Sequence, residues 1–386
     1  MARPAPLVLV FSALAAPLAA RQIPDSLLQP AMHGMDSLLQ ERAARGAFSG
    51  VVLVGMLNGR GGRVLFARAN GIADRGTGAA NAVGTRFVTG SVAKTFVAVG
   101  ALKLVDAGTL ALDTAVSRYL PDSVYSHARG DSITVRELLT HTAGLGDVVT
   151  GPAFRASPGA ITRFEQLLGL VRADSSVGPV GSFVYGGDDY LLLGAILARA
   201  SGQTFADYMR HAVFEAAGMA NTGYILVPRP GDLARGYTTR NLGGPAYARP
   251  GDPNGAPLHA NDPILPGVGV PGAVAYTTAT DLMHFADALW SHRLVSDGAL
   301  AALWSPQVLT GQGDRNPANR AYGFGFFVGT DGSQRLVNHG GTGPGVDVAF
   351  DIYPDLGCVV VVLANLDPPA AQDVRAFVRR AFAEVR

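Results

Sequence analysis

The sequence predicts an α/β (α+β) fold in which one antiparallel sheet, built from N- and C-terminal strands, carries a mostly helical insertion. Three observations predict it. Strand-like apolar runs bounded by turn residues occur at about residues 50–75 and again at 320–386. Between them, at about residues 90–310, apolar residues recur mainly at helical spacing. The 386 residues suffice for a large core, and Gly and Pro are spread through apolar segments, which excludes a collagen-like chain.

The first 20 residues have the pattern of a secretory signal peptide. Arg3 supplies the positive start, residues 7–18 are apolar, and Ala19 and Ala20 offer small residues for cleavage. The apolar run is too short to span a bilayer as a stable helix. We therefore expect an exported protein, periplasmic or secreted, with one domain over residues 21–386 and no stable transmembrane span after removal of the signal.

A helix and a hairpin are expected next. Residues 24–45 predict an amphipathic helix, because their apolar side chains recur at helical spacing. Residues 51–57 and 64–68 predict two strands, and the Asn58-Gly59 pair between them is typical of a hairpin turn.

The middle of the chain changes to the helical period. Helices are expected at residues 91–105, 134–140, 161–171, 190–200, 205–215, 280–290 and 298–304. The stretch 228–272 is rich in Gly and Pro and too long for a plain connection. Such segments usually border a site or form an irregular lobe.

The last part of the chain returns to strands. They are expected at residues 322–328, 335–338, 346–352 and 358–363, before a closing helix at 370–384. Cys358 is the only cysteine, so an internal disulfide and a Cys-rich metal site are excluded. Its apolar surroundings predict a buried strand residue.

Charge and motif content narrow the possible partners. The formal net charge is +1, which argues against electrostatic capture of nucleic acid or an anionic membrane. Residues 267–272 match a dinucleotide-type glycine motif, but Pro271 interrupts it and no βαβ pattern surrounds it. The eight histidines are scattered, and His141 is interpreted as structural. We expect no cofactor, no metal and a small-molecule substrate, and the sequence leaves the oligomeric state open.

A serine and a lysine open the most apolar predicted helix. Since positions i and i+3 share a helix face, Ser91 and Lys94 should face each other at the helix start. A neutral, buried lysine amine can accept a serine proton, and free N–H groups at the helix start can stabilise an oxyanion. Only two of the 31 basic residues are lysines, and lysine, unlike arginine, can release its proton. The alternative is an N-cap serine followed by a chance lysine.

Further motifs occur in a recognisable order. They are Leu112-Asp113, Tyr119-Leu120-Pro121, residues 133–145, Tyr185 ahead of residues 190–194, Ser201-Gly202, residues 218–223, residues 322–325 and residues 339–342. With Ser91 and Lys94, this set resembles the serine β-lactamase/D-alanyl-D-alanine carboxypeptidase superfamily. The similarity is greatest to the class C β-lactamase-like branch, which includes β-lactamase-fold esterases, and it covers roughly residues 50–365.

The resemblance implies the β-lactamase/DD-peptidase-like fold and a set of roles. Ser91 matches the nucleophile, Lys94 the base, and Tyr185 the tyrosine that moves protons between nucleophile, leaving group and water. The substrate-binding strand would be His339, Gly340, Gly341 and Thr342. The main-chain N–H groups of Ser91 and Thr342 would form the oxyanion hole.

Two departures from the family pattern bear on the substrate. Gly187 stands where the second motif usually has asparagine, and the acid Asp188 that follows could approach Lys94. His339 stands where many β-lactamases have lysine, and a mostly neutral histidine attracts a substrate carboxylate less strongly.

The sequence therefore predicts a serine hydrolase that forms an acyl-enzyme on Ser91. An esterase or a D-amino-acid peptidase or carboxypeptidase for small esters or amides is favoured. The alternatives are a class C-like β-lactamase and a weakly active penicillin-binding sensor or scaffold.

Overall fold

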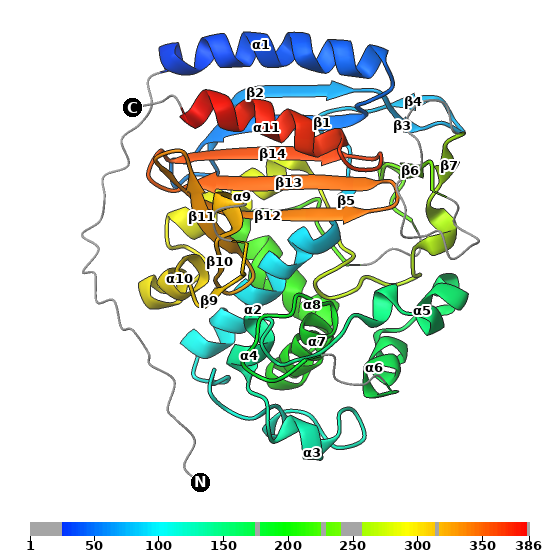
Figure 1. Cartoon of the computed structure of the whole chain (residues 1–386), viewed down its shortest axis with the longest axis vertical. Helices are drawn as coiled ribbons and strands as arrows, with labels where there is room; N and C mark the ends of the chain where they lie inside the picture. Colours follow the sequence, from blue (N-terminus) through cyan, green and yellow to red (C-terminus); the bar gives the residue numbers. More distant parts are fainter. Residues whose placement is uncertain (1–24, 174–177, 225–228, 241–256, 313–315, 384–386) are drawn as a thin grey trace.

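An eight-stranded antiparallel sheet organises the molecule (Figure 1). The computed structural model describes residues 25–173, 178–224, 229–240, 257–312 and 316–383. The strand order is β2-β1-β14-β13-β12-β11-β10-β9. Strand β1 pairs with β14 along its whole length, from Gly50 opposite Ala364 to Met56 opposite Cys358. The prediction that both ends of the chain build one sheet is confirmed.

The strands of this sheet are β1 (Gly50–Met56), β2 (Arg63–Asn70), β9 (Val308–Leu309), β10 (Ala321–Tyr322), β11 (Phe327–Asp331), β12 (Gln334–Gly343), β13 (Val346–Tyr353) and β14 (Cys358–Ala364). Among the described residues, three small antiparallel pairs lie outside it: β3 (Ile72–Asp74) with β4 (Ala79–Ala80), β5 (Phe87–Val88) with β8 (Tyr276–Thr277), and β6 (Tyr237–Thr238) with β7 (His259–Ala260).

The central strands are buried on both faces, because side chains alternate along a strand and each face carries its own core. Val51 and Leu53 belong to the core under the helical part, whereas Val52 and Val54 belong to the core on the opposite face. Cys358 lies in this second core as a free, buried thiol, as predicted.

Helices cover both faces of the sheet. Helices α1 (Asp25–Ala44) and α11 (Ala370–Ala383) pack against each other, and α11 contacts β13 and β14 (Figure 1). The opposite side carries α2 (Ala93–Asp106), α3 (His127–Gly130), α4 (Val135–Leu139), α5 (Pro152–Ala156), α6 (Phe164–Ala173), α7 (Asp188–Ser201), α8 (Phe205–Met209), α9 (Ala279–Trp290) and α10 (Asp297–Trp304). Within the described ranges, no helix has the length and apolar character needed to cross a membrane.

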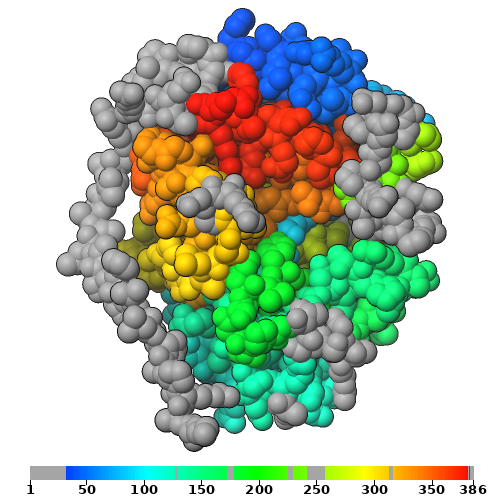
Figure 2. Space-filling view, viewed as in Figure 1, coloured from blue at the N-terminus to red at the C-terminus, as the bar shows by residue number. Residues whose placement is uncertain are grey.

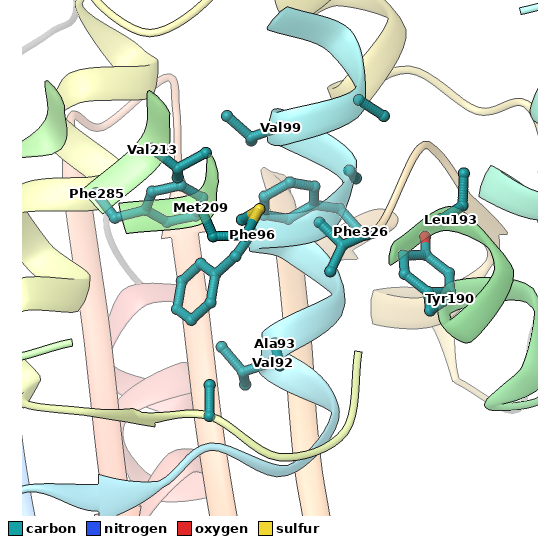
Figure 3. Packing of buried hydrophobic residues seen from close by; sticks show 14 of the residues in the cluster. Val92, Ala93, Phe96, Val99, Tyr190, Leu193, Met209, Val213, Phe285 and Phe326 are labelled. Atoms are coloured by element: carbon teal, nitrogen blue, oxygen red, sulfur yellow. The ribbon is translucent and has the colours of Figure 1, made fainter. Parts of the chain in front are cut away.

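Helix α2 runs through the middle of the helical part (Figure 3). It is apolar almost all round and is therefore buried among its neighbours rather than lying on the surface. The Phe96 ring meets Phe214 and Phe285 edge to face, with centroids 5.3 and 5.0 Å away. This packing fixes the first turns of α2 against the neighbouring helices.

The structure corrects two predicted elements. Residues 322–328 are not one strand, because a turn separates β10 from β11, and Gly325 has φ +76° within it. A Cβ on Gly325 would lie 2.5 Å from Cβ of Ala98, so glycine lets this turn approach α2. The predicted helix 205–215 changes to a π-helix at Arg210–Glu215. The predicted signal at residues 1–20 lies outside the described residues.

Candidate active site

Ser91 and Lys94 lie at the point where α2 begins. A single 3-10 turn, Gly90–Val92, leads into the helix. Lys94 Nζ is 3.3 Å from Ser91 Oγ and donates a 2.8 Å hydrogen bond to the carbonyl oxygen of Gly272. Lys94 is only 2% exposed, whereas Ser91 is half-buried. The predicted juxtaposition of the two side chains is confirmed.

A glycine gives Lys94 this backbone acceptor. Gly272 has φ +72°, and a Cβ there would lie 2.5 Å from Cβ of Tyr190 and 3.0 Å from Cγ of Lys94. A side chain would therefore collide with both residues and push the carbonyl away. The expectation that residues 228–272 border a site holds for Gly272, while residues 228 and 241–256 lie outside the described residues.

The strand β12 approaches the Ser91 turn very closely. A Cβ on Gly341 would lie 2.0 Å from the carbonyl oxygen of Thr89 and 3.0 Å from the backbone nitrogen of Ser91. Gly90 has φ +52°, and a Cβ there would lie 3.1 Å from the backbone nitrogen of Thr342. The two glycines thus bring the N–H groups of Ser91 and Thr342 to the same small region. Thr342 is exposed and Gly340 is half-buried.

Figure 2 shows a hollow between the orange C-terminal strands and the green part of the helical layer. Cyan atoms from the region of α2 are visible at the floor of the hollow.

Tyr185 lies across from the lysine. Lys94 Nζ is 4.8 Å from the centroid of the Tyr185 ring, and 41% of Tyr185 is exposed. The same ring stacks on Phe327, with centroids 6.0 Å apart. Tyr185 therefore joins Ser91 and Lys94 in one site, with one edge toward solvent.

His141 holds the segment that carries Tyr185. Its carbonyl oxygen accepts a 2.8 Å hydrogen bond from the N–H of Val184, and the N–H of Gly186 lies 3.5 Å from its Nδ1. Its ring centroid is 4.5 Å from that of Tyr185. His141 has φ +57°, an uncommon conformation that histidine tolerates better than most residues. The structural role predicted for His141 is thus one of positioning Tyr185.

A buried acid accompanies this histidine. His141 Nδ1 lies 2.8 Å from Asp189 Oδ2. Burial, together with the charge of Lys94, holds the pKa of His141 well below its usual value. Burial and the neighbouring Asp188 raise the pKa of Asp189 well above its usual value. Both shifts favour the uncharged forms, so the pair adds little net charge near Lys94.

His339 lies under the site rather than in it. Its side chain is buried, with Nδ1 2.6 Å from the carbonyl oxygen of Gly340 and Nε2 3.3 Å from the hydroxyl of Tyr322. Burial and the charge of Lys94 lower its pKa to about 3. The imidazole is therefore neutral near pH 7 and offers no positive charge to a substrate.

Sequence reasoning missed Asp147. Its carboxylate occupies the space beside Gly187, where a Cβ would lie 2.6 Å from Asp147 Oδ1. Asp188, for which the sequence left an approach to Lys94 open, accepts a 2.8 Å hydrogen bond from the N–H of Val148. No spacing signal could have found Asp147, because 40 residues separate it from Gly187 in the chain.

The part of the chain that the structure describes contains no group of three or more His, Cys, Asp or Glu side chains arranged to hold a metal ion.

Comparisons with known proteins agree with this architecture. Penicillin-binding protein 4* of Bacillus subtilis (strain 168) is 26% identical over 341 residues, covering 86% of this chain and 71% of that protein. Esterase EstB of Burkholderia gladioli is 35% identical over 202 residues, covering 49% of this chain and 50% of that protein. The crystal structure of a penicillin binding protein from Bacillus halodurans superimposes with a TM-score of 0.75 at 27% identity, covering 92% of this chain and 98% of that chain.

The family model named Beta-lactamase matches residues 35–384. This match spans the sheet, the helical part and every residue of the site described above. The chain therefore belongs to the Beta-lactamase family of serine hydrolases.

Proposed function

We propose that the protein hydrolyses small esters or amides through an acyl-enzyme on Ser91. One observation carries the proposal: a half-buried serine hydroxyl lies 3.3 Å from the amine of a buried lysine at the start of α2. Acyl transfer requires an activated nucleophile, and an adjacent amine in its neutral form can remove the hydroxyl proton.

The proton path uses Lys94, which contacts Ser91, and Tyr185, which lies beside Lys94. Ser91 Oγ attacks the substrate carbonyl while Lys94 accepts its proton. Tyr185, beside Lys94, passes a proton to the leaving group as the bond to that group breaks. A water molecule then attacks the acyl-serine, with the same groups moving the protons in the opposite direction, and the carboxylic acid leaves Ser91.

The negative oxygen of the tetrahedral intermediate needs fixed donors. The N–H groups of Ser91 and Thr342 are brought together by Gly341 and Gly90, and they suit this task. Their backbone positions need no reorganisation during the reaction.

The neutral His339 favours substrates without a carboxylate near β12, because it supplies no cation to bind one. This supports an esterase or amidase over a β-lactamase. A β-lactamase is the second candidate, supported by the relative from Bacillus subtilis that is named as a penicillin-binding protein. Steady turnover of a chromogenic cephalosporin, at rates equal to those with esters, would reverse the order of the two.

Steady-state hydrolysis of p-nitrophenyl butyrate tests the proposal. The protein should release p-nitrophenol over many turnovers, and Ser91→Ala should remove this activity while the circular dichroism spectrum stays the same. Equal rates in the two proteins would exclude Ser91 as the nucleophile.

We further propose that the protein is exported, on the pattern of residues 1–20. N-terminal sequencing of the protein from the culture medium or periplasm should begin near residue 21. Recovery from the cytoplasm with Met1 retained would contradict export.

A further inference from the structure

The half of β12 that reaches the site has a strand on only one side in the described sheet. Strand β11 pairs with residues 334–338 of β12, whereas β13 pairs with residues 337–343. Alternate residues of a strand direct their N–H and C=O groups to the same edge, so Gly340 and Thr342 share an edge. The oxyanion hole proposed above uses the N–H of Thr342, which places the carbonyl oxygen of Gly340 on the edge away from β13.

The imidazole of His339 supplies a partner for this carbonyl. Its Nδ1 lies 2.6 Å from the Gly340 oxygen. A carbonyl oxygen only accepts hydrogen bonds, so the ring proton is on Nδ1. In a neutral imidazole Nε2 is then an acceptor, and it takes the hydroxyl proton of Tyr322, 3.3 Å away. The two bonds together set the tautomer and the orientation of the ring.

Aromatic rings surround the imidazole and hold it in place. The centroid of His339 is 5.3 Å from that of Phe327, 6.1 Å from that of Tyr322 and 6.2 Å from that of Tyr185. His339 is only 1% exposed. The imidazole therefore acts on the reaction through its protein neighbours and does not touch the substrate.

The glycines of β12 cannot hold the strand at the Ser91 turn through side chains of their own. A Cβ on Gly341 would lie 2.0 Å from the carbonyl oxygen of Thr89, so this stretch has to be bare. Glycine also has the most conformational freedom of any residue, and that freedom must be removed for the backbone to stay fixed. A bond to the Gly340 carbonyl restrains the peptide unit close to Thr342, whose N–H must be in place before the reaction.

We propose that His339 is a positioning residue for the oxyanion hole: its Nδ1–H holds the Gly340 carbonyl and thereby sets the direction of the Thr342 N–H. Tyr322 acts with it by holding Nε2. This inference rests on the proposed acyl transfer to Ser91. It follows from the 2.6 Å contact with the Gly340 oxygen, the fixed ring and the glycines that bring β12 to Ser91.

Two amide side chains that match different ring nitrogens test the inference. In His339→Asn the side-chain nitrogen can take the place of Nδ1 and donate to the Gly340 carbonyl, whereas in His339→Gln the amide reaches the place of Nε2. Both variants remove the ring and its contact with Tyr185. On p-nitrophenyl butyrate, kcat should fall at least tenfold in His339→Gln with little change in KM, and His339→Asn should recover most of that loss.

A pair of substrates separates the oxyanion hole from other effects of these variants. The tetrahedral intermediate of p-nitrophenyl butyrate carries its charge on oxygen. That of p-nitrophenyl thionobutyrate carries it on sulfur, which accepts hydrogen bonds from N–H groups weakly. The ratio of the two kcat/KM values therefore measures how well the backbone donors are placed. This ratio should fall at least tenfold in His339→Gln and stay within about threefold of the wild type in His339→Asn.

Two tyrosine variants keep the imidazole and test the same hydrogen bonds. Tyr322→Phe removes the hydroxyl that holds Nε2 and should lower the ratio about threefold. Tyr353→Phe removes a buried hydroxyl that donates to Asp331 at 2.8 Å, in the core on the opposite face of the sheet, and should keep the wild-type ratio. If His339→Gln does not fold, the Tyr322→Phe ratio decides, and an unchanged value would overturn the inference.

The ratio also separates positioning from general support of the fold. A wild-type ratio in a folded His339→Gln, or equal losses in His339→Gln and His339→Asn, would show that the ring only supports Tyr185 or the core, and would overturn the inference. Ser91-dependent hydrolysis of p-nitrophenyl butyrate would keep the proposed function in either case. Absence of any Ser91-dependent turnover would refute the proposed function itself, and this inference with it.

Discussion

The two lysines of the chain both donate to a backbone carbonyl oxygen, but Lys94 is buried and Lys103 is half-buried. Lys94 donates to the carbonyl oxygen of Gly272, and Lys103 donates to that of Leu294 at 2.9 Å. Burial lowers the pKa of Lys103. Only Lys94 also contacts a serine hydroxyl. The pair therefore offers a natural comparison between a lysine proposed to move a proton and a lysine that fastens two segments.

Replacement of each lysine by arginine tests this difference. Lys94→Arg keeps the positive charge but removes a group that can lose its proton, so kcat for p-nitrophenyl butyrate should fall about 10²–10⁴-fold. Lys103→Arg should stay within a few-fold of the wild type. Comparable activity of Lys94→Arg and the wild type would show that Lys94 is not the base.

Sequence spacing was sufficient for some residues of the site and insufficient for others. Ser91 and Lys94 are separated by one helical turn, and a helix start is a local structure that spacing can predict. Asp147 reaches Gly187 only through the docking of one loop on another. Local patterns carry no information on such a contact. The same holds for the Gly272 carbonyl beside Lys94.

At the scale of elements, the contact between β12 and the Ser91 turn determines the site. The predicted strand 335–338 is only the first half of β12, which continues to Gly343 through a motif with three glycines. Glycine-rich sequence argues against a strand, and pairing with β13 overrides that preference from His339 to Gly343. The break between β10 and β11 was also not predicted. Gly325 lets the turn between these strands approach α2, and this tertiary contact leaves no local signal in the sequence.

Two glycines of β12 allow a matched test. In Gly341→Ala, the new methyl group would lie 2.0 Å from the carbonyl oxygen of Thr89 and would force β12 away from Ser91. Activity should fall at least 10²-fold, because the paired N–H donors separate. In Gly343→Ala the nearest atom, Cβ of Val346, is 3.9 Å away, so activity should change less than threefold. Equal kcat values for the two variants in the ester assay would show that the close approach is not needed.

At the scale of the molecule, the site lies where the sheet meets the helical part, and that junction buries titratable groups. The predicted layering of terminal strands and helical middle is confirmed. It could be predicted because each layer has its own periodic pattern of apolar residues. Which polar groups are enclosed between the layers depends on packing across the junction. His339 and Asp189 are examples that periodicity could not place.

Burial of His339 should make the protein sensitive to acid. Its folded pKa of about 3 lies below the ordinary value of 6.5, so between these limits the unfolded chain binds the proton and the folded chain does not. The free energy of unfolding therefore decreases as the pH falls from 6.5, by about 2 kcal/mol at pH 5 from this group. Urea unfolding at pH 7 and pH 5 measures the change.

A variant assigns that change to His339. The difference in the free energy of unfolding between pH 7 and pH 5 should be about 2 kcal/mol smaller in His339→Asn than in the wild type, whatever the absolute stability of the variant. The exposed His211, replaced by Asn, should leave the difference as it is in the wild type. An unchanged difference in His339→Asn would contradict neutral burial of the imidazole.

Labelling with a fluorophosphonate tests the central claim most directly. An activated serine attacks the phosphorus, forms a stable oxygen–phosphorus bond and releases fluoride, whatever the natural substrate. We predict one phosphonyl group per folded molecule, mapped by peptide mass spectrometry to Ser91 and lost in Lys94→Arg. A folded protein that takes no label, or a label mapped to another residue, would contradict the assignment of Ser91 as the nucleophile.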